Sequence, residues 1–149
     1  MTTSFLLFIA ITAIVAALLE IQIEGSAGWA KNLPTWRSNP KKWHGKMFRL
    51  LFNQSDVTGY HIAFWAFVLT AYHGPLFWDV AWSISLEADI LTGFLIFWVL
   101  EDFLWFVFNP HYGIRKFNPR YIPWHKRWIG PFPVQYYTSA ILVVLLSFI

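Results

Sequence analysis

Four stretches of the chain are apolar over about the length that a membrane-spanning helix needs, which is about 20 residues. They cover about residues 3–23, 57–77, 83–108 and 134–149, and the charged residues gather between them. Isolated strands would leave their backbone groups unpaired in lipid, so we expect all four stretches to be α-helices. The pattern therefore predicts an all-α fold, an integral membrane four-helix bundle.

Local signals mark the ends of the second and third stretches. The turn-like sequence NQSD at 53–56 precedes the second, and Asn109-Pro110 ends the third because proline disfavours helical geometry in the residue before it. The long connections are then 25–56 and 109–133. No internal repeat divides the chain, so residues 1–149 are expected to form a single transmembrane domain.

The first long connection contains an amphipathic segment, KKWHGKMFRLLF, at 41–52. At helical spacing its apolar and basic side chains fall on two different faces, Trp43, Met47, Leu50 and Leu51 on one and Lys42, Lys46 and Arg49 on the other. This pattern is typical of a helix that lies in the interface plane of a membrane.

Composition and charge agree with a membrane protein and orient it. The chain is 57% apolar and 13% charged, against about one quarter charged in soluble domains. All eleven Lys and Arg residues lie in the two long connections, which four spans place on the same side of the membrane. The positive-inside rule makes that side cytoplasmic and both termini extracytoplasmic.

The basic connections also indicate what the protein meets. They predict contact with membrane lipids, including anionic headgroups at the cytoplasmic face, and no nucleic-acid partner. A homo-oligomer and a larger membrane complex are both compatible with the sequence. With no cysteine in the chain, disulfides and thiolate metal sites are excluded.

Three ionisable side chains on three different predicted helices share one depth. At 1.5 Å rise per residue, Glu20, His61 and Glu101 each lie about 9 to 10 Å to the cytoplasmic side of the mid-plane. A charge inside the hydrocarbon region costs several kcal/mol unless it is paired, and such residues often mark function. We expect a buried carboxylate and histidine site at the cytoplasmic side, built around Glu101.

Carboxylates and imidazoles on bundle helices are the ligands that di-iron and di-manganese proteins use. The first hypothesis is therefore a metal-dependent enzyme that acts on a lipid or another hydrophobic substrate with divalent Fe, Mn or Zn. Its predicted metal ligands are Glu20, His61 and Glu101 with His111 or His125. Its predicted catalytic residues are Glu101, Asp102 and His61, with Asp102 orienting a ligand or acting as a base.

A proton-coupled transporter or channel is a second hypothesis. Titratable groups also occur in the outer half of the predicted bundle, where His73, Glu87 and Asp89 lie. Glu87 and Glu101 are fourteen residues apart and share a face of the third helix. A relay between them would need bound water, because the residues between them on that face are apolar.

The third hypothesis is an accessory or scaffold subunit whose buried acids pair with its own basic connections. Arg115 and Arg120 would reach back to Glu101 and Asp102, and Arg37 would reach the acids of the first helix. The sequence leaves all three hypotheses open.

Two segments, LEIQIEGSAGWAKNLPTWR at 19–37 and EDFLWFVFNPHYG at 101–113, carry a resemblance. With the chain as a whole, they resemble a family of small bacterial four-helix integral membrane proteins. The resemblance implies a multi-pass protein of the bacterial inner membrane, and it implies no activity and no site residues. Each segment leads from the cytoplasmic end of a span into a basic connection, so we expect the connections to fold back over the buried acids.

Overall fold

The computed structural model describes residues 1–54 and 56–149 and is mostly helical there. The α-helices in this part are α1 (Thr3–Glu24), α2 (Trp43–Phe52), α3 (Gly59–Tyr72), α4 (Ile84–Phe108) and α5 (Val134–Leu146). The other elements are the 3₁₀ helices η1 (Gly74–Trp78) and η2 (Ile114–Lys116) and the paired strands β1 (Trp128–Ile129) and β2 (Phe132–Pro133). The turn predicted at 53–56 includes Ser55, which lies outside the described residues.

The long apolar helices form where the sequence predicts them. α1 and α4 each agree with a predicted stretch to within one residue at either end, and both are long and apolar enough to cross a membrane. α3, with 14 residues, and α5, with 13, are shorter than the predicted stretches. Fourteen residues rise about 21 Å, against about 30 Å of hydrocarbon, so length alone does not make α3 or α5 a span.

The early end of α3 has a local cause. The predicted stretch continues to residue 77, but the helix stops at Tyr72 and the chain turns into η1. Pro75 lies in the first turn of η1 and Gly74 precedes it. Proline disfavours helical geometry in the residue before it, so this pair interrupts the helix in spite of the apolar residues that follow.

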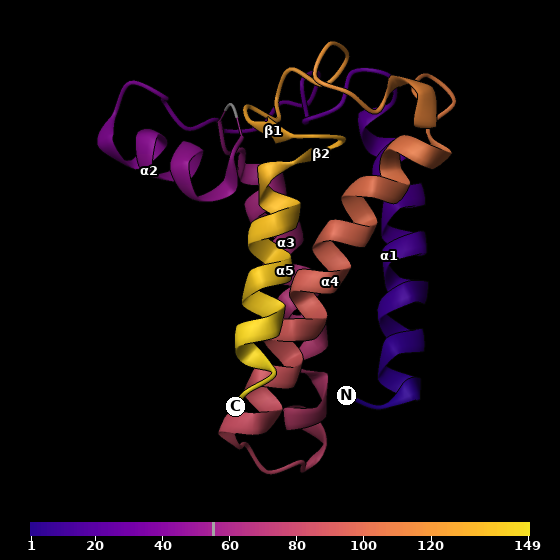
Figure 1. Ribbon diagram of the computed structural model, residues 1–149, viewed down its shortest axis with the longest axis vertical. Helices are drawn as coiled ribbons and strands as arrows, with labels where there is room; N and C mark the ends of the chain where they lie inside the picture. Colours follow the sequence, from indigo (N-terminus) through magenta and orange to yellow (C-terminus); the bar gives the residue numbers. More distant parts are fainter. Residues whose placement is uncertain (55) are drawn as a thin grey trace.

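α4 is the central helix, and it contacts α1, α3 and α5. Both long connections lie at one end of the molecule and both termini at the other (Figure 1). Buried alanines on α1, among them Ala13 and Ala17, permit close packing against the bundle. The apolar core continues through Tyr72 of α3 and Phe97 of α4.

The two long connections are joined to each other and to the start of α3. The Ser38 N–H donates to the carbonyl oxygen of Val57 at 2.8 Å, and the Gly59 N–H donates to that of Trp36 at 2.8 Å. Between the connections, the Lys126 N–H donates to the Asn53 carbonyl oxygen at 2.9 Å. The connections therefore form one layer over the ends of the helices.

The amphipathic segment of the first connection is helical, as predicted, and forms α2 beside the bundle (Figure 1). Trp43 and Leu50 on its predicted apolar face are exposed, while the side chain of Leu51 lies outside the described part of the chain. Near its start, Gly45 packs directly on the preceding turn. A Cβ atom there would overlap the backbone carbonyl of Asn39.

Gly45→Ala should therefore destabilise the protein by about 1 to 3 kcal/mol, the usual cost of overpacking. Backbone, rather than a flexible side chain, would have to move to make room for the new Cβ. Thermal unfolding in detergent measures the effect, with the exposed neighbour Lys46→Ala as the control. Equal unfolding midpoints for the two variants would contradict the close approach.

Candidate functional site

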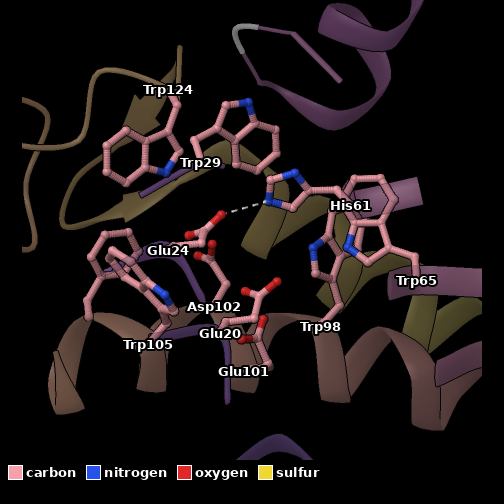
Figure 2. Close-up of a pocket in the computed structure, with 11 residues that line it drawn as sticks. Glu20, Glu24, Trp29, His61, Trp65, Trp98, Glu101, Asp102, Trp105 and Trp124 are labelled. Atoms are coloured by element: carbon pink, nitrogen blue, oxygen red, sulfur yellow. Dashed lines mark ion pairs between the residues drawn. The ribbon is translucent and has the colours of Figure 1, made fainter. Parts of the chain in front are cut away.

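A small cavity lies where α1, α3 and α4 meet the layer of connections (Figure 2). Its volume is about 30 Å³, which is room for one or two water molecules. Aromatic side chains from the helices and both connections, mostly tryptophans, form much of its wall. The ionisable side chains that line it are Glu20 and Glu24 from α1, His61 from α3, and Glu101 and Asp102 from α4.

The four carboxyl groups come from two helices and face one another across the cavity (Figure 2). Glu20 and Glu101 are only 6% and 5% exposed. The Oε1 atom of each has no hydrogen-bond partner among the described residues. Within the same part of the chain, no ion pair joins a lysine or arginine to any of the four acids. Among the described residues, only histidines, and no lysine or arginine, lie within ion-pair distance of this buried acidic cluster.

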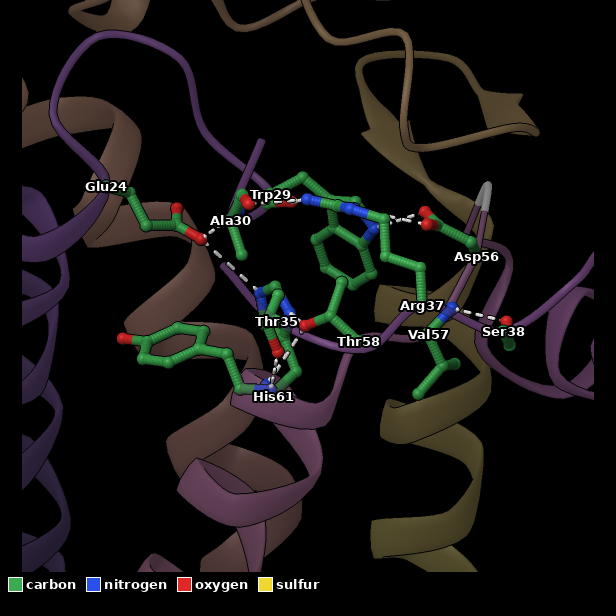
Figure 3. A network of polar contacts seen from close by, with 11 residues as sticks. Glu24, Trp29, Ala30, Thr35, Arg37, Ser38, Asp56, Val57, Thr58 and His61 are labelled. Atoms are coloured by element: carbon green, nitrogen blue, oxygen red, sulfur yellow. Dashed lines mark hydrogen bonds and ion pairs between the residues drawn. The ribbon is translucent and has the colours of Figure 1, made fainter. Parts of the chain in front are cut away.

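His61 is held in a defined orientation beside Glu24 (Figure 3). Its Nδ1 lies 2.6 Å from the hydroxyl oxygen of Thr58, and Thr58 is also the N-cap residue of α3. Its Nε2 lies 3.6 Å from Oε1 of Glu24. The indole ring of Trp29 stacks on the imidazole with ring centroids 4.0 Å apart. The packing therefore fixes the ring plane and directs Nε2 toward the acids.

Arg37 holds the segment that contacts Glu24. Its guanidinium donates to the carbonyl oxygens of Trp29 and Ala30 and to Oδ2 of Asp56, the last at 3.1 Å. Trp29 and Ala30 have φ values of 51° and 50°, which are uncommon for residues other than glycine. The Ala30 N–H donates to Oε1 of Glu24 at 2.5 Å, so Arg37 acts on the acidic cluster through this short segment (Figure 3).

A chain of hydrogen bonds from the second connection determines the tautomer of His125. The Arg127 N–H donates to Oδ1 of Asn53 at 2.8 Å, so the Asn53 amide nitrogen donates to Oε1 of Gln135 at 2.7 Å. The Gln135 amide nitrogen then faces Nδ1 of His125 at 2.5 Å and must be the donor there. The direction of every bond in this chain follows from the Arg127 backbone N–H, which can only donate. Nδ1 of His125 is therefore an acceptor, and the ring proton lies on Nε2.

In this tautomer the N–H group of His125 lies near Asp102, although Nε2 makes no hydrogen bond among the described residues. Nε2 of His125 lies 3.3 Å from Oδ2 of Asp102, and the Tyr136 hydroxyl donates to the same oxygen at 2.5 Å. Asp102 is thus held by one hydrogen-bond donor, the Tyr136 hydroxyl of α5, with the imidazole of His125 close beside it. In this tautomer Nε2 of His125 carries the ring proton, so this nitrogen has no free lone pair for a metal ion.

The structure brings most of the predicted site together and leaves two histidines apart. Glu20, His61, Glu101 and Asp102 line one cavity. His125 lies behind Asp102, with Nε2 3.3 Å from Oδ2 of Asp102, and is not among the residues that line the cavity. His111 is exposed on the second connection and is not among the residues that line the cavity.

Sequence reasoning missed several participants. Glu24 lies one turn after Glu20 on the same face of α1, a spacing that the sequence shows, but the predicted ligands did not include it. Asn53, Gln135 and Tyr136 carried no such signal, because the contact between Asn53 and Gln135 joins residues 82 positions apart and that between Tyr136 and Asp102 joins residues 34 apart.

The donor set fits a divalent cation in kind, since carboxylate oxygens and imidazole suit Mn, Fe and Zn. No three of the described His, Cys, Asp and Glu side chains are already arranged as a metal site. Binding an ion would therefore require the carboxyl groups to turn toward a common point.

A second group of titratable residues lies at the opposite end of the bundle. Nε2 of His73 is 3.2 Å from Oε1 of Glu87, and the Trp82 indole N–H donates to Oε2 of Glu87 at 3.2 Å. The buried apolar cluster that contains Tyr72 and Phe97 lies between this pair and the cavity.

Comparisons of the chain with protein-family models, with curated proteins and with solved structures give no match.

Proposed function

We propose that this chain is a four-helix integral membrane protein of the bacterial inner membrane whose buried acidic site binds a divalent metal ion. In this proposal α3 and α5 cross the membrane with α1 and α4, and the termini are extracytoplasmic. The support is the segregation of charge, because all eleven Lys and Arg residues lie in the connections at one end of the bundle (Figure 1). The amphipathic α2 would lie in the interface at that end.

The observation that carries the metal site is the acidic cluster, in which no described lysine or arginine pairs with a carboxyl group. Four carboxyl groups face a cavity of about 30 Å³, and those of Glu20 and Glu101 each keep a buried oxygen without a donor among the described residues. A buried charge without a partner is expensive, and a bound cation would remove that cost. Glu20, Glu24, Glu101 and His61 are the proposed ligands.

Asp102 has a different proposed role, because the Tyr136 hydroxyl already donates to one of its oxygens. The Tyr136 hydroxyl orients the carboxyl group, and its position on the cavity wall suits a base that accepts a proton from a substrate. A bound divalent ion would supply Lewis acidity. We propose that the substrate is a lipid or another hydrophobic molecule that approaches from the membrane.

The other two hypotheses find less support. The scaffold hypothesis predicts that Arg37 pairs with the acids of α1, whereas Arg37 pairs with Asp56. Arg115 and Arg120 are exposed, and the described residues include no ion pair from either to Glu101 or Asp102. A proton relay would have to pass the apolar cluster between the two titratable groups.

Metal content of the protein purified in detergent without chelators tests the proposal. We expect a stoichiometric divalent ion in the unmodified protein and at least about a tenfold loss of metal affinity in Glu20→Gln and Glu101→Gln. Glu87→Gln, on the same helix as Glu101 but at the other end, is the matched control and should keep the metal.

A second measurement, the thermal unfolding midpoint, distinguishes a bound metal ion from protons bound to the carboxyl groups. When the free metal concentration is a hundred times Kd, a bound ion should stabilise the protein by about 2.7 kcal/mol. The thermal unfolding midpoint should rise accordingly, and a chelator should reverse the rise. Glutamine resembles a protonated glutamate, so a site neutralised by protons would tolerate Glu101→Gln with little change. Absence of metal in the unmodified protein, together with an unchanged midpoint in Glu101→Gln, would overturn the proposal.

A further inference from the structure

An apolar groove of about 740 Å³ lies between α4 and α5. This volume is within the range of about 300 to 1,000 Å³ that is common for small-molecule sites. Leu95 and Val99 of α4 and Val143 of α5 form part of its walls. Phe132 and Tyr136 lie on its wall at the end next to the connections, so the groove runs along the helices toward the candidate site.

Tyr136 joins this groove to the acidic cavity. Its ring lines the groove, and its hydroxyl donates to Oδ2 of Asp102 at 2.5 Å. Asp102 in turn lines the cavity. The Tyr136 side chain therefore links the wall of the apolar groove to one of the carboxyl groups of the cavity.

We infer that the groove holds one acyl chain of a membrane lipid, with the polar end of that lipid at Tyr136 and Asp102. The inference names the substrate class of the candidate site, and to that extent it rests on the proposed function. It predicts that the acyl chain extends from the end of the bundle next to the connections, where lipid headgroups would lie, toward Leu95 and Val144.

The size and chemistry of the groove favour an acyl chain over a helix of a second copy. A spanning helix about 10 Å across and 30 Å long occupies on the order of 2,000 Å³, several times the volume of the groove. The walls are almost wholly apolar, and their polar group nearest the site is the Tyr136 hydroxyl, which lies where a lipid changes from chain to headgroup.

A second apolar pocket provides an internal comparison. It has a volume of about 240 Å³, lies between α1 and α3, and is lined by residues that include Val15 and Phe67. None of its lining residues lines the acidic cavity. If lipid chains merely coat the whole apolar surface, both places should be occupied to a similar extent.

Photolabelling of the full-length protein in nanodiscs tests the inference. The probe is phosphatidylglycerol with a diazirine in one acyl chain, and labelled residues are located by peptide mass spectrometry. We expect labels concentrated on α4 and α5 around the groove, and a several-fold loss in Val143→Trp, which fills it. Leu142→Trp, at the adjacent exposed position outside the groove, should label like the unmodified protein.

Further variants separate chain binding from misfolding and from the metal site. Ala140→Phe narrows the groove from the same helix and should also lose label, while metal content stays unchanged in both groove variants. Tyr136→Phe keeps the ring and removes the hydroxyl. This variant should still be labelled by a lipid whose diazirine is near the end of the acyl chain, and it should lose labelling by a lipid whose diazirine is near the ester.

Two results would overturn the inference. One is equal labelling of the groove and of the pocket at Val15 and Phe67, unaffected by Val143→Trp. The other is protein-to-protein crosslinking through the groove in place of lipid labelling. Loss of metal binding with intact groove labelling would instead count against the proposed function alone.

Discussion

Asn53→Ala is expected to destabilise the protein by about 2 to 5 kcal/mol. The Asn53 side chain is 2% exposed, accepts the Arg127 N–H, and donates both to the Arg127 carbonyl oxygen and to Oε1 of Gln135. Alanine would leave the buried Gln135 side chain and the partly buried Arg127 backbone groups without that partner, at about 1 to 3 kcal/mol for each group that finds no other. Thermal and denaturant unfolding in detergent measure the loss.

The variant should also disturb the site, because Asn53 sets the polarity of the hydrogen bonds that reach His125. Asn53→Asp keeps an acceptor for the Arg127 N–H and removes the donor to Gln135, so we expect an intermediate loss of stability and a rotated Gln135 amide. Asn32→Ala, at an exposed position of the first connection, is the control. If Asn53→Ala unfolds like Asn32→Ala, the connections are not joined through this amide.

Arg37→Met is expected to cost about 2 to 4 kcal/mol and to weaken metal binding. The change removes an ion pair with Asp56 and the donors to the carbonyl oxygens of Trp29 and Ala30, and hydrogen bonds to charged groups contribute about 1.5 to 3 kcal/mol. The Arg37 side chain is 33% exposed, so solvent reduces the effect of the ion pair itself. Most of the loss should come from the two carbonyl contacts.

The effect on the metal follows from geometry. Without Arg37, the segment at Trp29 and Ala30 loses the group that holds it, and the Ala30 N–H would no longer be kept at Glu24. Metal titration and unfolding midpoints should therefore fall together. Arg37→Lys keeps the positive charge but lacks the planar guanidinium, so it should restore only part of the stability and of the metal binding. Lys31→Met, exposed in the same connection, should behave like the unmodified protein; a matching result for Arg37→Met would contradict this role.

The helices were largely predictable because their causes are local. The apolar runs of α1 and α4 and the amphipathic spacing of α2 each lie within one segment, and each helix forms where the pattern indicates. The early end of α3 at Tyr72 also has a local cause, the Gly74-Pro75 pair. The apolar residues that follow this pair concealed it, because hydropathy does not report backbone geometry.

The site was only partly predictable. Helix depth placed Glu20, His61 and Glu101 together, since rise per residue converts sequence position into height along a bundle. The same estimate says nothing about loops, so it could not separate His125, buried behind Asp102, from His111, exposed on the surface. The two histidines looked equivalent in sequence because both follow apolar, aromatic-rich segments.

By itself the sequence determined the mostly helical fold, the segregation of all eleven cations to two connections, and the depth shared by three ionisable side chains. These properties depend on composition and on spacing within one helix. Only the tertiary structure decided which oxygens are left without donors, which nitrogen of His125 carries the proton, and that Tyr136 stands between an apolar groove and the acids. Such contacts join residues far apart in sequence, and they depend on the direction of each side chain, which no pattern along the chain specifies.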